Sequence, residues 1–236
     1  MKEHDVHSTK KIKRVFVKDE AYNMLEEAIV NGDLAPNARL KINELSETLG
    51  ISRTPIREAI LRLENEGLVI SKANQWTIVA PIRIDSIKYI YPLVYDLEAF
   101  CLKDGFVKID RNFTDELRKI NALILEENQH SHQESLLELD NTFHNKIIQL
   151  SENIEVRPIL DSLKRKLRRL ETLFYKSKKI NEPPSSYEEH LALIEALEEG
   201  DLQKSLKKLE INWTNVLDKD SLAQLRREDA YKDYFV

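Results

Sequence analysis

Apolar residues recur at the three- and four-residue spacing of amphipathic helices along most of this 236-residue chain. In the first third, this pattern predicts helices over 19–31, 42–49 and about 52–66. Two short β-prone pieces follow, at 68–71 and 76–79, and the four residues between them suit a hairpin turn. Three helices followed by a hairpin are typical of a winged helix-turn-helix.

Beyond residue 80 the helical pattern continues without another strand. The segment Ala80-Pro81-Ile82-Arg83 interrupts the β-pattern and is the best candidate for a linker. The predicted fold class is therefore mainly α, with an N-terminal winged helix-turn-helix and an all-helical C-terminal domain. The helices expected after the linker are at about 84–104, 112–129, 133–151, 154–179, 186–199, 201–217 and 220–232.

A chain of this length can hold two domains, each with its own hydrophobic core. We expect a winged helix-turn-helix DNA-binding domain at 19–80 and a helical ligand-binding domain at 86–218, joined by a linker at 81–85. Residues 1–18 are then an N-terminal arm, and residues 219–236 are a C-terminal tail.

The five glycines all lie near the ends of apolar-periodic runs, where a helix C-cap favours a left-handed residue. No glycine-rich phosphate-binding loop can be assembled from them, which argues against a kinase or a dehydrogenase. The glycines are Gly32, Gly50, Gly67, Gly105 and Gly200.

Composition restricts the class of protein further. With 33% charged and 42% hydrophobic residues, the chain is too apolar for disorder and too interrupted by charge for a membrane span. A single cysteine, Cys101, excludes an internal disulfide framework and fits a reducing compartment. The basic segment 10–14 is not followed by the apolar region of a signal peptide. These features predict a cytoplasmic protein without a membrane partner.

The formal net charge of −5 is unevenly distributed. Residues 1–83 carry 13 basic and 12 acidic side chains, whereas the remainder carries 23 and 29, so the two parts have net charges of +1 and −6. A charge of +1 gives no broad positive field. Any affinity for DNA must therefore come from the local placement of a few basic side chains.

The third predicted helix separates polar from apolar side chains. Arg53, Thr54 and Arg57 project from its N-terminal half, the part of a recognition helix that reaches base edges. An arginine can donate two hydrogen bonds to guanine, whereas Arg62, at the rim, suits a phosphate contact. An ordinary solvated helix face is the alternative interpretation. The opposite face, which packs inward, consists of Ile56, Ala59, Ile60 and Leu63.

Residues 45–69 carry the motif Leu45-Ser46-Glu47-x-Leu49-Gly50-Ile51-Ser52-Arg53-Thr54-Pro55-Ile56-Arg57-Glu58-Ala59-Ile60-x-Arg62-Leu63-x-x-Glu66-Gly67-Leu68-Val69. Through this motif, residues 21–79 closely resemble the winged helix-turn-helix of GntR-superfamily regulators. The resemblance implies that Arg53, Thr54 and Arg57 contact operator DNA, and that the hairpin tip with Asn74 enters the minor groove. Asn43 stands where the family often carries an arginine, and Asn74 lies at a tip where the family often has glycine, so both are candidate DNA contacts.

The helical part contains a candidate metal site. Asp140 and His144 are four residues apart, so they share one face of a helix, and His190 opens a later helix. A carboxylate and two imidazoles can bind a divalent transition metal, although a surface ion pair explains the same spacing. A basic run at 164–169 can likewise be a solvated helix face, or it can meet DNA or an acidic effector.

Two further motifs lie in the helical part: Asp140-x-x-Phe143-His144 and Glu189-His190-x-x-x-Ile194-x-Ala196-Leu197-x-x-Gly200-Asp201. Through them, residues 84–218 resemble the FCD ligand-binding domain of the FadR subgroup, an antiparallel helical bundle. In metal-binding members, one aspartate and three histidines hold an ion, and a small carboxylate effector often completes its coordination. Asp140, His144 and His190 match three of these ligands, and Asn212 stands at the fourth position. The resemblance thus implies a divalent ion such as Zn, Ni or Mn.

The leading hypothesis is a homodimeric transcription regulator that binds double-stranded operator DNA and responds to a small-molecule effector. The dimer is implied by the resemblance alone. A second hypothesis is a helical metalloenzyme in which Asp140, His144 and His190 hold a catalytic metal, although the chain has no motif such as H-E-x-x-H. A third is a protein-binding adaptor whose winged helix has lost DNA binding, against which the retained Arg53 and Arg57 argue.

Overall fold

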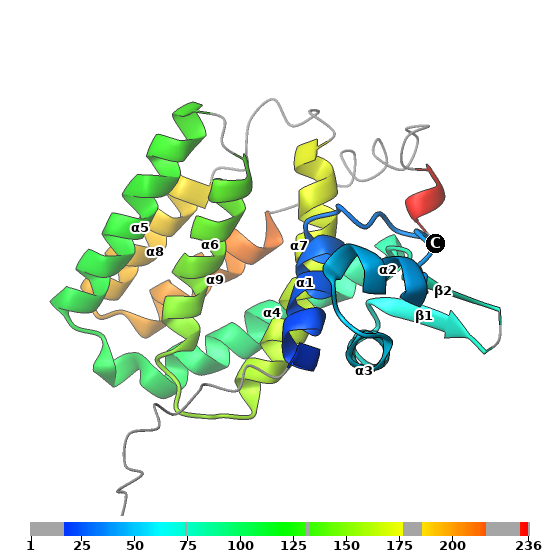
Figure 1. Ribbon diagram of the computed structural model, residues 1–236. Coiled ribbons are helices and arrows are strands. Elements are labelled where there is room, and N and C mark those ends of the chain that lie inside the picture. Colours follow the sequence, from blue (N-terminus) through cyan, green and yellow to red (C-terminus); the bar gives the residue numbers. More distant parts are fainter. Residues whose placement is uncertain (1–16, 74, 131–132, 177–185, 216–231, 236) are drawn as a thin grey trace, which may run out of the picture.

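The computed structural model describes residues 17–73, 75–130, 133–176, 186–215 and 232–235. It confirms the predicted fold class, which is mainly helical with a two-stranded wing (Figure 1). The N-terminal elements are α1 (Val17–Val30), α2 (Ile42–Leu49), α3 (Arg53–Asn65), β1 (Val69–Lys72) and β2 (Trp76–Val79). The later elements are α4 (Ile84–Gly105), η1 (Phe106–Lys108), α5 (Arg111–His130), α6 (Gln133–Ile148), α7 (Val156–Lys176), α8 (Ser186–Glu198), α9 (Leu202–Thr214) and η2 (Lys232–Tyr234).

The wing is an antiparallel hairpin in which Val69 pairs with Val79. The chain before α2 adds to its edge, because the Leu40 amide donates to the carbonyl of Thr77 at 2.8 Å. Side chains from the three helices and the hairpin form one hydrophobic core under α3. The largest fully buried side chains of this core are Ile29, Ile56, Leu63 and Leu68.

The helical domain has a separate core, whose largest fully buried side chain is Phe143. Helix α4 packs against α7 and α9, while α5 packs against α6 and α8. Helix α7 stands between the bundle and the winged domain, where it also contacts α1 (Figure 1). Among the described residues, no helix combines the length and the apolar composition that crossing a lipid bilayer requires.

The chain between the two cores is short and is fixed from two sides. Strand β2 ends at Val79 and α4 begins at Ile84, while the Ile82 amide donates to the carbonyl of Tyr234 at 2.8 Å. Ile82 also forms a parallel bridge with Phe235, so the end of the predicted tail packs against the linker. The helix expected at 220–232 falls almost entirely outside the described residues, as does most of the N-terminal arm.

One expectation about the glycines is wrong. Gly32, Gly50, Gly67 and Gly200 have positive φ angles, as expected for helix C-caps, but Gly105 has a φ of −103°. A Cβ atom at Gly105 would fall on the backbone carbonyl and Cβ of Leu150. Glycine is therefore required there by the close approach of the chain after α6, not by a left-handed turn.

Replacing Gly105 by alanine should destabilise the protein. The added methyl group has no room beside Leu150, and overpacking of this kind costs about 1–3 kcal/mol. The measurement is the urea midpoint of unfolding followed by circular dichroism. Lys103→Ala, at an exposed site two residues earlier, is the control and should change stability by less than about 0.5 kcal/mol. An unchanged midpoint for Gly105→Ala would show that the Leu150 segment can move aside.

Candidate metal centre and DNA-reading surface

Helix α3 presents the predicted DNA-reading side chains to solvent. It begins at Arg53, directly after Ser52, whose backbone is extended. Arg53, Thr54 and Arg57 are exposed, whereas Ile56 has none of its surface exposed. The first turns of α3 are thus fixed by burial of one face and open on the other. Contact of these three side chains with DNA remains a prediction.

The other predicted DNA contacts, Arg62, Asn43 and Asn74, do not share the solvent-exposed N-terminal half of α3. Arg62 lies over the ring of Tyr22, 3.6 Å from its centroid, and contacts Asp19 at 3.7 Å and Glu66 at 3.3 Å. A phosphate at Arg62 would have to compete with these partners. Asn43 is exposed at the second residue of α2, and Asn74 lies outside the described residues.

The predicted metal ligands Asp140, His144 and His190 lie together inside the helical domain. One ligand atom from each residue lies within 4.8 Å of the others. Asp140 Oδ2 is 3.9 Å from Nε2 of His144, and Asp140 Oδ1 is 3.5 Å from Nε2 of His190. Helix α6 supplies the first two side chains and α8 supplies the third. Two imidazoles and one carboxylate form a donor set that suits divalent transition metals.

Glu98 of α4 orients one of these imidazoles. Its carboxylate is fully buried and accepts hydrogen bonds from Nδ1 of His144 and from Nε1 of Trp213, both at 2.8 Å. In the neutral imidazole, a proton on Nδ1 leaves the lone pair on Nε2, the nitrogen that lies 3.9 Å from Asp140. Burial opposes a charge on the imidazole, but the Glu98 carboxylate raises the pKa of His144 above its usual value.

His190 is the strongest local indication of a ligand. Its side chain is completely buried, and neither ring nitrogen has a hydrogen-bond partner among the described residues. The ring stacks on Phe143 with centroids 3.8 Å apart, which fixes its plane. Burial and the neighbouring His144 lower the pKa of His190 well below the usual value, so the ring is neutral. A neutral, buried imidazole without partners is costly unless something coordinates it.

Asn212, the residue at the fourth ligand position, is buried on α9. Its Nδ2 donates to Glu189 Oε2 at 3.0 Å, and Asn215 donates to the other oxygen of Glu189 at 2.8 Å. The amide nitrogen is thereby engaged with α8. Only the amide oxygen of Asn212 would then be available to serve as a ligand.

A cavity of about 420 Å³ lies beside the three ligands, between α1 of the winged domain and helices α6 and α7. Asp140 lines it and is 36% exposed, whereas His144 and His190 are nearly sealed. Lys164, Arg168 and Glu171 line it from α7. The volume is in the range of small-molecule sites. Asp140 is thus the member of the triad that a molecule in the cavity can reach.

The basic run at 164–169 is not a solvated helix face. Arg169 is buried and donates to the carbonyl of Ala80, and burial lowers its pKa to about 10. Lys164 is half-buried and donates to Asn145 at 3.0 Å. Sequence reasoning alone does not identify Glu98 as part of the site, because 46 residues separate it from His144.

Comparison with known protein families gives two matches along the chain. Residues 17–79 match the family of bacterial regulatory proteins called gntR, and residues 89–209 match the FCD domain. The first match contains α2, α3 and the wing. The second contains Glu98 and the Asp140, His144 and His190 cluster.

Individual relatives are transcription regulators of distant sequence. The chain is 26% identical over 144 residues to the HTH-type transcriptional regulator YdhC of Bacillus subtilis, covering 59% of this chain and 63% of that protein. It is 26% identical over 164 residues to the Nta operon transcriptional regulator of Aminobacter aminovorans, covering 69% and 74%. The chain thus spans a little under two thirds of the length of the first relative.

The fold is shared with a solved structure. The structure of McbR/YncC from Escherichia coli superimposes with a TM-score of 0.75 at 21% identity, covering 93% of this chain and 99% of that one. With the two family matches, this shows that the chain belongs to the gntR family of bacterial transcription regulators, in the FadR-like subgroup with a C-terminal FCD domain.

Proposed function

We propose that this regulator binds a specific DNA operator through α3 as a homodimer in the cytoplasm, where bacterial DNA lies, and that its helical domain senses a small effector beside a divalent metal ion. The observation that carries the metal proposal is His190, a fully buried imidazole whose nitrogens have no hydrogen-bond partner in the described part of the chain and whose Nε2 lies 3.5 Å from the Asp140 carboxylate. Membership in a family of transcription regulators argues against the metalloenzyme alternative.

In this proposal, Asp140, His144 and His190 hold the ion, and Asn212 contributes its amide oxygen or binds a coordinated water. Zinc bonds to these donors are about 2.0–2.2 Å long, so the three ligand atoms need to close in slightly around an ion. Zn, Ni and Mn all fit a mixed nitrogen and oxygen donor set. When bound, the ion would supply a positive charge that a carboxylate can coordinate.

The effector would occupy the cavity between α1 and α7. Lys164 and Arg168 can bind the acidic group of a small carboxylate, while Asp140 places the ion in the same wall. Because α1 belongs to the winged domain, an effector there contacts both domains. Such a molecule would bias the orientation of the winged domain only if it bound one orientation better than another.

A stripe of apolar side chains along α4 supports the homodimer. Tyr89, Leu93 and Phe100 are 64%, 49% and 41% exposed, and their four- and seven-residue spacing places them on one helix face. Single exposed apolar residues are common, but an aligned set is typical of an association surface. A two-fold dimer would match the symmetry of a palindromic operator.

Replacing Arg57 by alanine should weaken sequence-specific DNA binding. If Arg57 makes a bidentate base contact, its loss costs about 1–3 kcal/mol. Fluorescence anisotropy with a duplex selected from a random pool measures the affinity. Arg111→Ala, which removes an exposed arginine at the start of α5, is the matched control and should bind like the wild type. Equal affinities for Arg57→Ala and the wild type would refute the assigned base contact.

Protein purified without an affinity tag should contain one equivalent of divalent metal per chain by mass spectrometry of the metal. Asp140→Asn and His144→Ala should each lower zinc affinity by about 10-fold or more, because loss of a direct ligand exceeds the usual effect of its supporting partners. Asp161→Asn, which changes another carboxylate in the cavity wall, should keep the metal. Full metal content in both ligand variants would exclude this site, and DNA binding should persist in all three.

Substituting glutamate for Leu93 should dissociate the dimer. A charge at the centre of the α4 stripe would have to be buried against the second copy without a partner. Sedimentation velocity at micromolar concentration should show dimers for the wild type and monomers for the variant. Leu123→Glu, at a similarly exposed leucine on α5, should remain dimeric. A dimeric Leu93→Glu variant would place the interface elsewhere.

A further inference from the structure

Arg165 links the helical domain to the recognition helix. Its Nη2 lies 3.1 Å from Oε2 of Glu66, and its Nε lies 3.8 Å from Oε1 of Glu26. Glu66 is the C-terminal cap of α3, and Glu26 belongs to α1. One guanidinium of α7 thus contacts two of the helices that build the DNA-binding domain. We call these three residues the α7 clamp.

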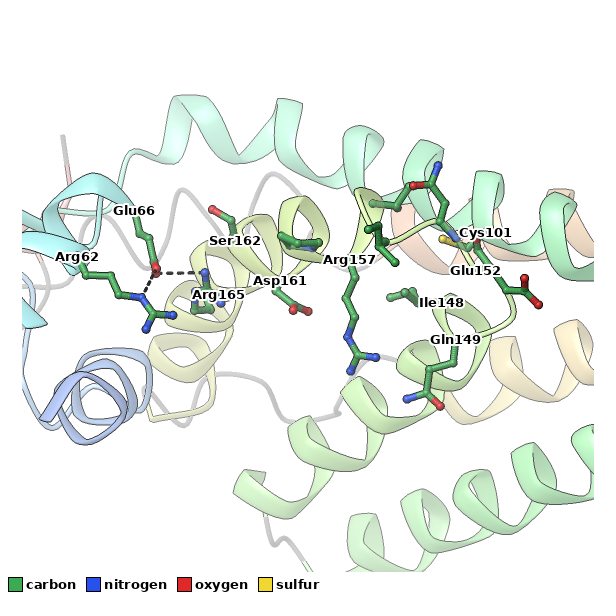
Figure 2. A pocket seen from close by; sticks show the side chains of 15 residues that line it. Arg62, Glu66, Cys101, Ile148, Gln149, Glu152, Arg157, Asp161, Ser162 and Arg165 are labelled. Atoms are coloured by element: carbon green, nitrogen blue, oxygen red, sulfur yellow. Dashed lines mark hydrogen bonds and ion pairs between the residues drawn. The ribbon is translucent and has the colours of Figure 1, made fainter. Parts of the chain in front are cut away.

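The contact continues into the winged domain itself. Glu66 lies between Arg165 and Arg62 (Figure 2), and it also accepts a hydrogen bond from the Tyr22 hydroxyl at 2.7 Å. Arg62 in turn lies over the Tyr22 ring. Since Tyr22 is a buried core residue of α1, displacement of Glu66 would disturb the packing between α1 and α3. Through Glu66, the clamp therefore contacts the side chains that pack α1 against α3.

The clamp is more protected from water than an ordinary surface ion pair. The side chains of Arg165, Glu66 and Glu26 are 24%, 20% and 25% exposed. Burial raises the pKa of Glu26, while the charge of Arg165 opposes this increase. Ion pairs with this degree of shielding are screened by salt less than exposed pairs, and removal of one partner leaves a poorly hydrated charge behind.

Arg165 also belongs to the wall of the cavity beside Asp140. Its neighbours Lys164 and Arg168 line the same cavity, and Glu26 lines it from α1. Helix α7 also reaches the winged domain through Lys176, which donates to the Asn31 carbonyl at 2.6 Å and lies 3.7 Å from Asp33. Arg165 joins the cavity wall to the end of α3.

We propose that Arg165 is a positioning residue, which fixes the orientation of α3 relative to the helical domain through Glu66 and Glu26. The inference rests on the proposed function, because orientation matters only if two winged domains bind one operator. In a dimer, the α7 clamp sets the spacing between two recognition helices. Its residues are distinct from the DNA-reading residues Arg53, Thr54 and Arg57 at the other end of α3.

The test compares one half-site with a complete operator, using the full chain and a duplex selected from a random pool. Arg165→Gln should bind an isolated half-site as the wild type does, because Glu66 keeps its contacts with Tyr22 and Arg62 and the DNA-reading residues are unchanged. Its extra affinity for two correctly spaced half-sites should fall about 10-fold, within the usual range of coupling between sites. Insertion of two base pairs between the half-sites should weaken the variant less than the wild type, since its domains are less fixed.

Matched variants separate positioning from loss of charge or stability. Lys166→Gln removes a positive charge one residue away on α7 and should keep the spacing preference of the wild type. Arg165→Lys keeps the charge and should retain part of that preference. Glu26→Gln removes one of the two contacts of the clamp from the other domain and should lose part of the spacing preference. This second route keeps the test decisive if Arg165→Gln does not fold.

The outcomes distinguish the positioning role of Arg165 from the DNA-binding function of the protein. An unchanged spacing preference in both Arg165→Gln and Glu26→Gln, with normal half-site binding, would overturn the positioning role and leave the proposed DNA-binding function intact. Failure of the wild type to bind any half-site or complete operator would overturn both.

Discussion

The carboxylate of Glu98 is the interaction on which the helical domain depends most. A buried carboxylate is tolerated only when its oxygens are paired, and each oxygen of Glu98 accepts one hydrogen bond from a different helix. His144 on α6 and Trp213 on α9 are thereby fixed relative to α4. The same bond that satisfies Glu98 turns Nε2 of His144 toward Asp140. The hydrogen bonds of Glu98 thus orient the candidate ligand His144 and also hold α6 and α9 against α4.

Helix α7 likewise serves two structural roles at the junction between the domains. Its apolar side chains, including Leu160, Leu167 and Leu170, are buried in the bundle core. Its basic side chains leave that core in two directions, toward the cavity beside Asp140 and toward the winged domain. The adjacent residues Lys164 and Arg165 therefore have different partners. Lys164 donates to Asn145 of the bundle, whereas Arg165 contacts Glu66 of the winged domain. A helix of this kind cannot shift toward a molecule in the cavity without changing its contacts with α1 and α3.

The sequence was sufficient for features that depend on neighbouring residues. For the described residues, periodicity predicted the helices and the hairpin to within a few residues, and spacing within one helix joined Asp140 to His144. Features that depend on distant contacts could not be predicted in this way. Nothing near Gly105 shows that Leu150 approaches it, and nothing near Arg165 shows that Glu66 lies 3.1 Å away. Similarly, the contacts of Arg62 with Tyr22 and Asp19 could not be predicted, because both partners lie on another helix.

The cavity has an excess of acidic side chains, which favours a bound cation independently of the geometry of the ligands. Six carboxylates line it against three basic side chains, and two of these carboxylates, Asp140 and Glu171, lie close enough to affect each other. Burial, together with Asp140, raises the pKa of Glu171 to about 7, so its ionisation is already opposed by its surroundings. A divalent ion beside Asp140 would relieve this excess of negative charge. It would also make the cavity more favourable for a carboxylate, because the carboxylate would meet the ion as well as Lys164 and Arg168.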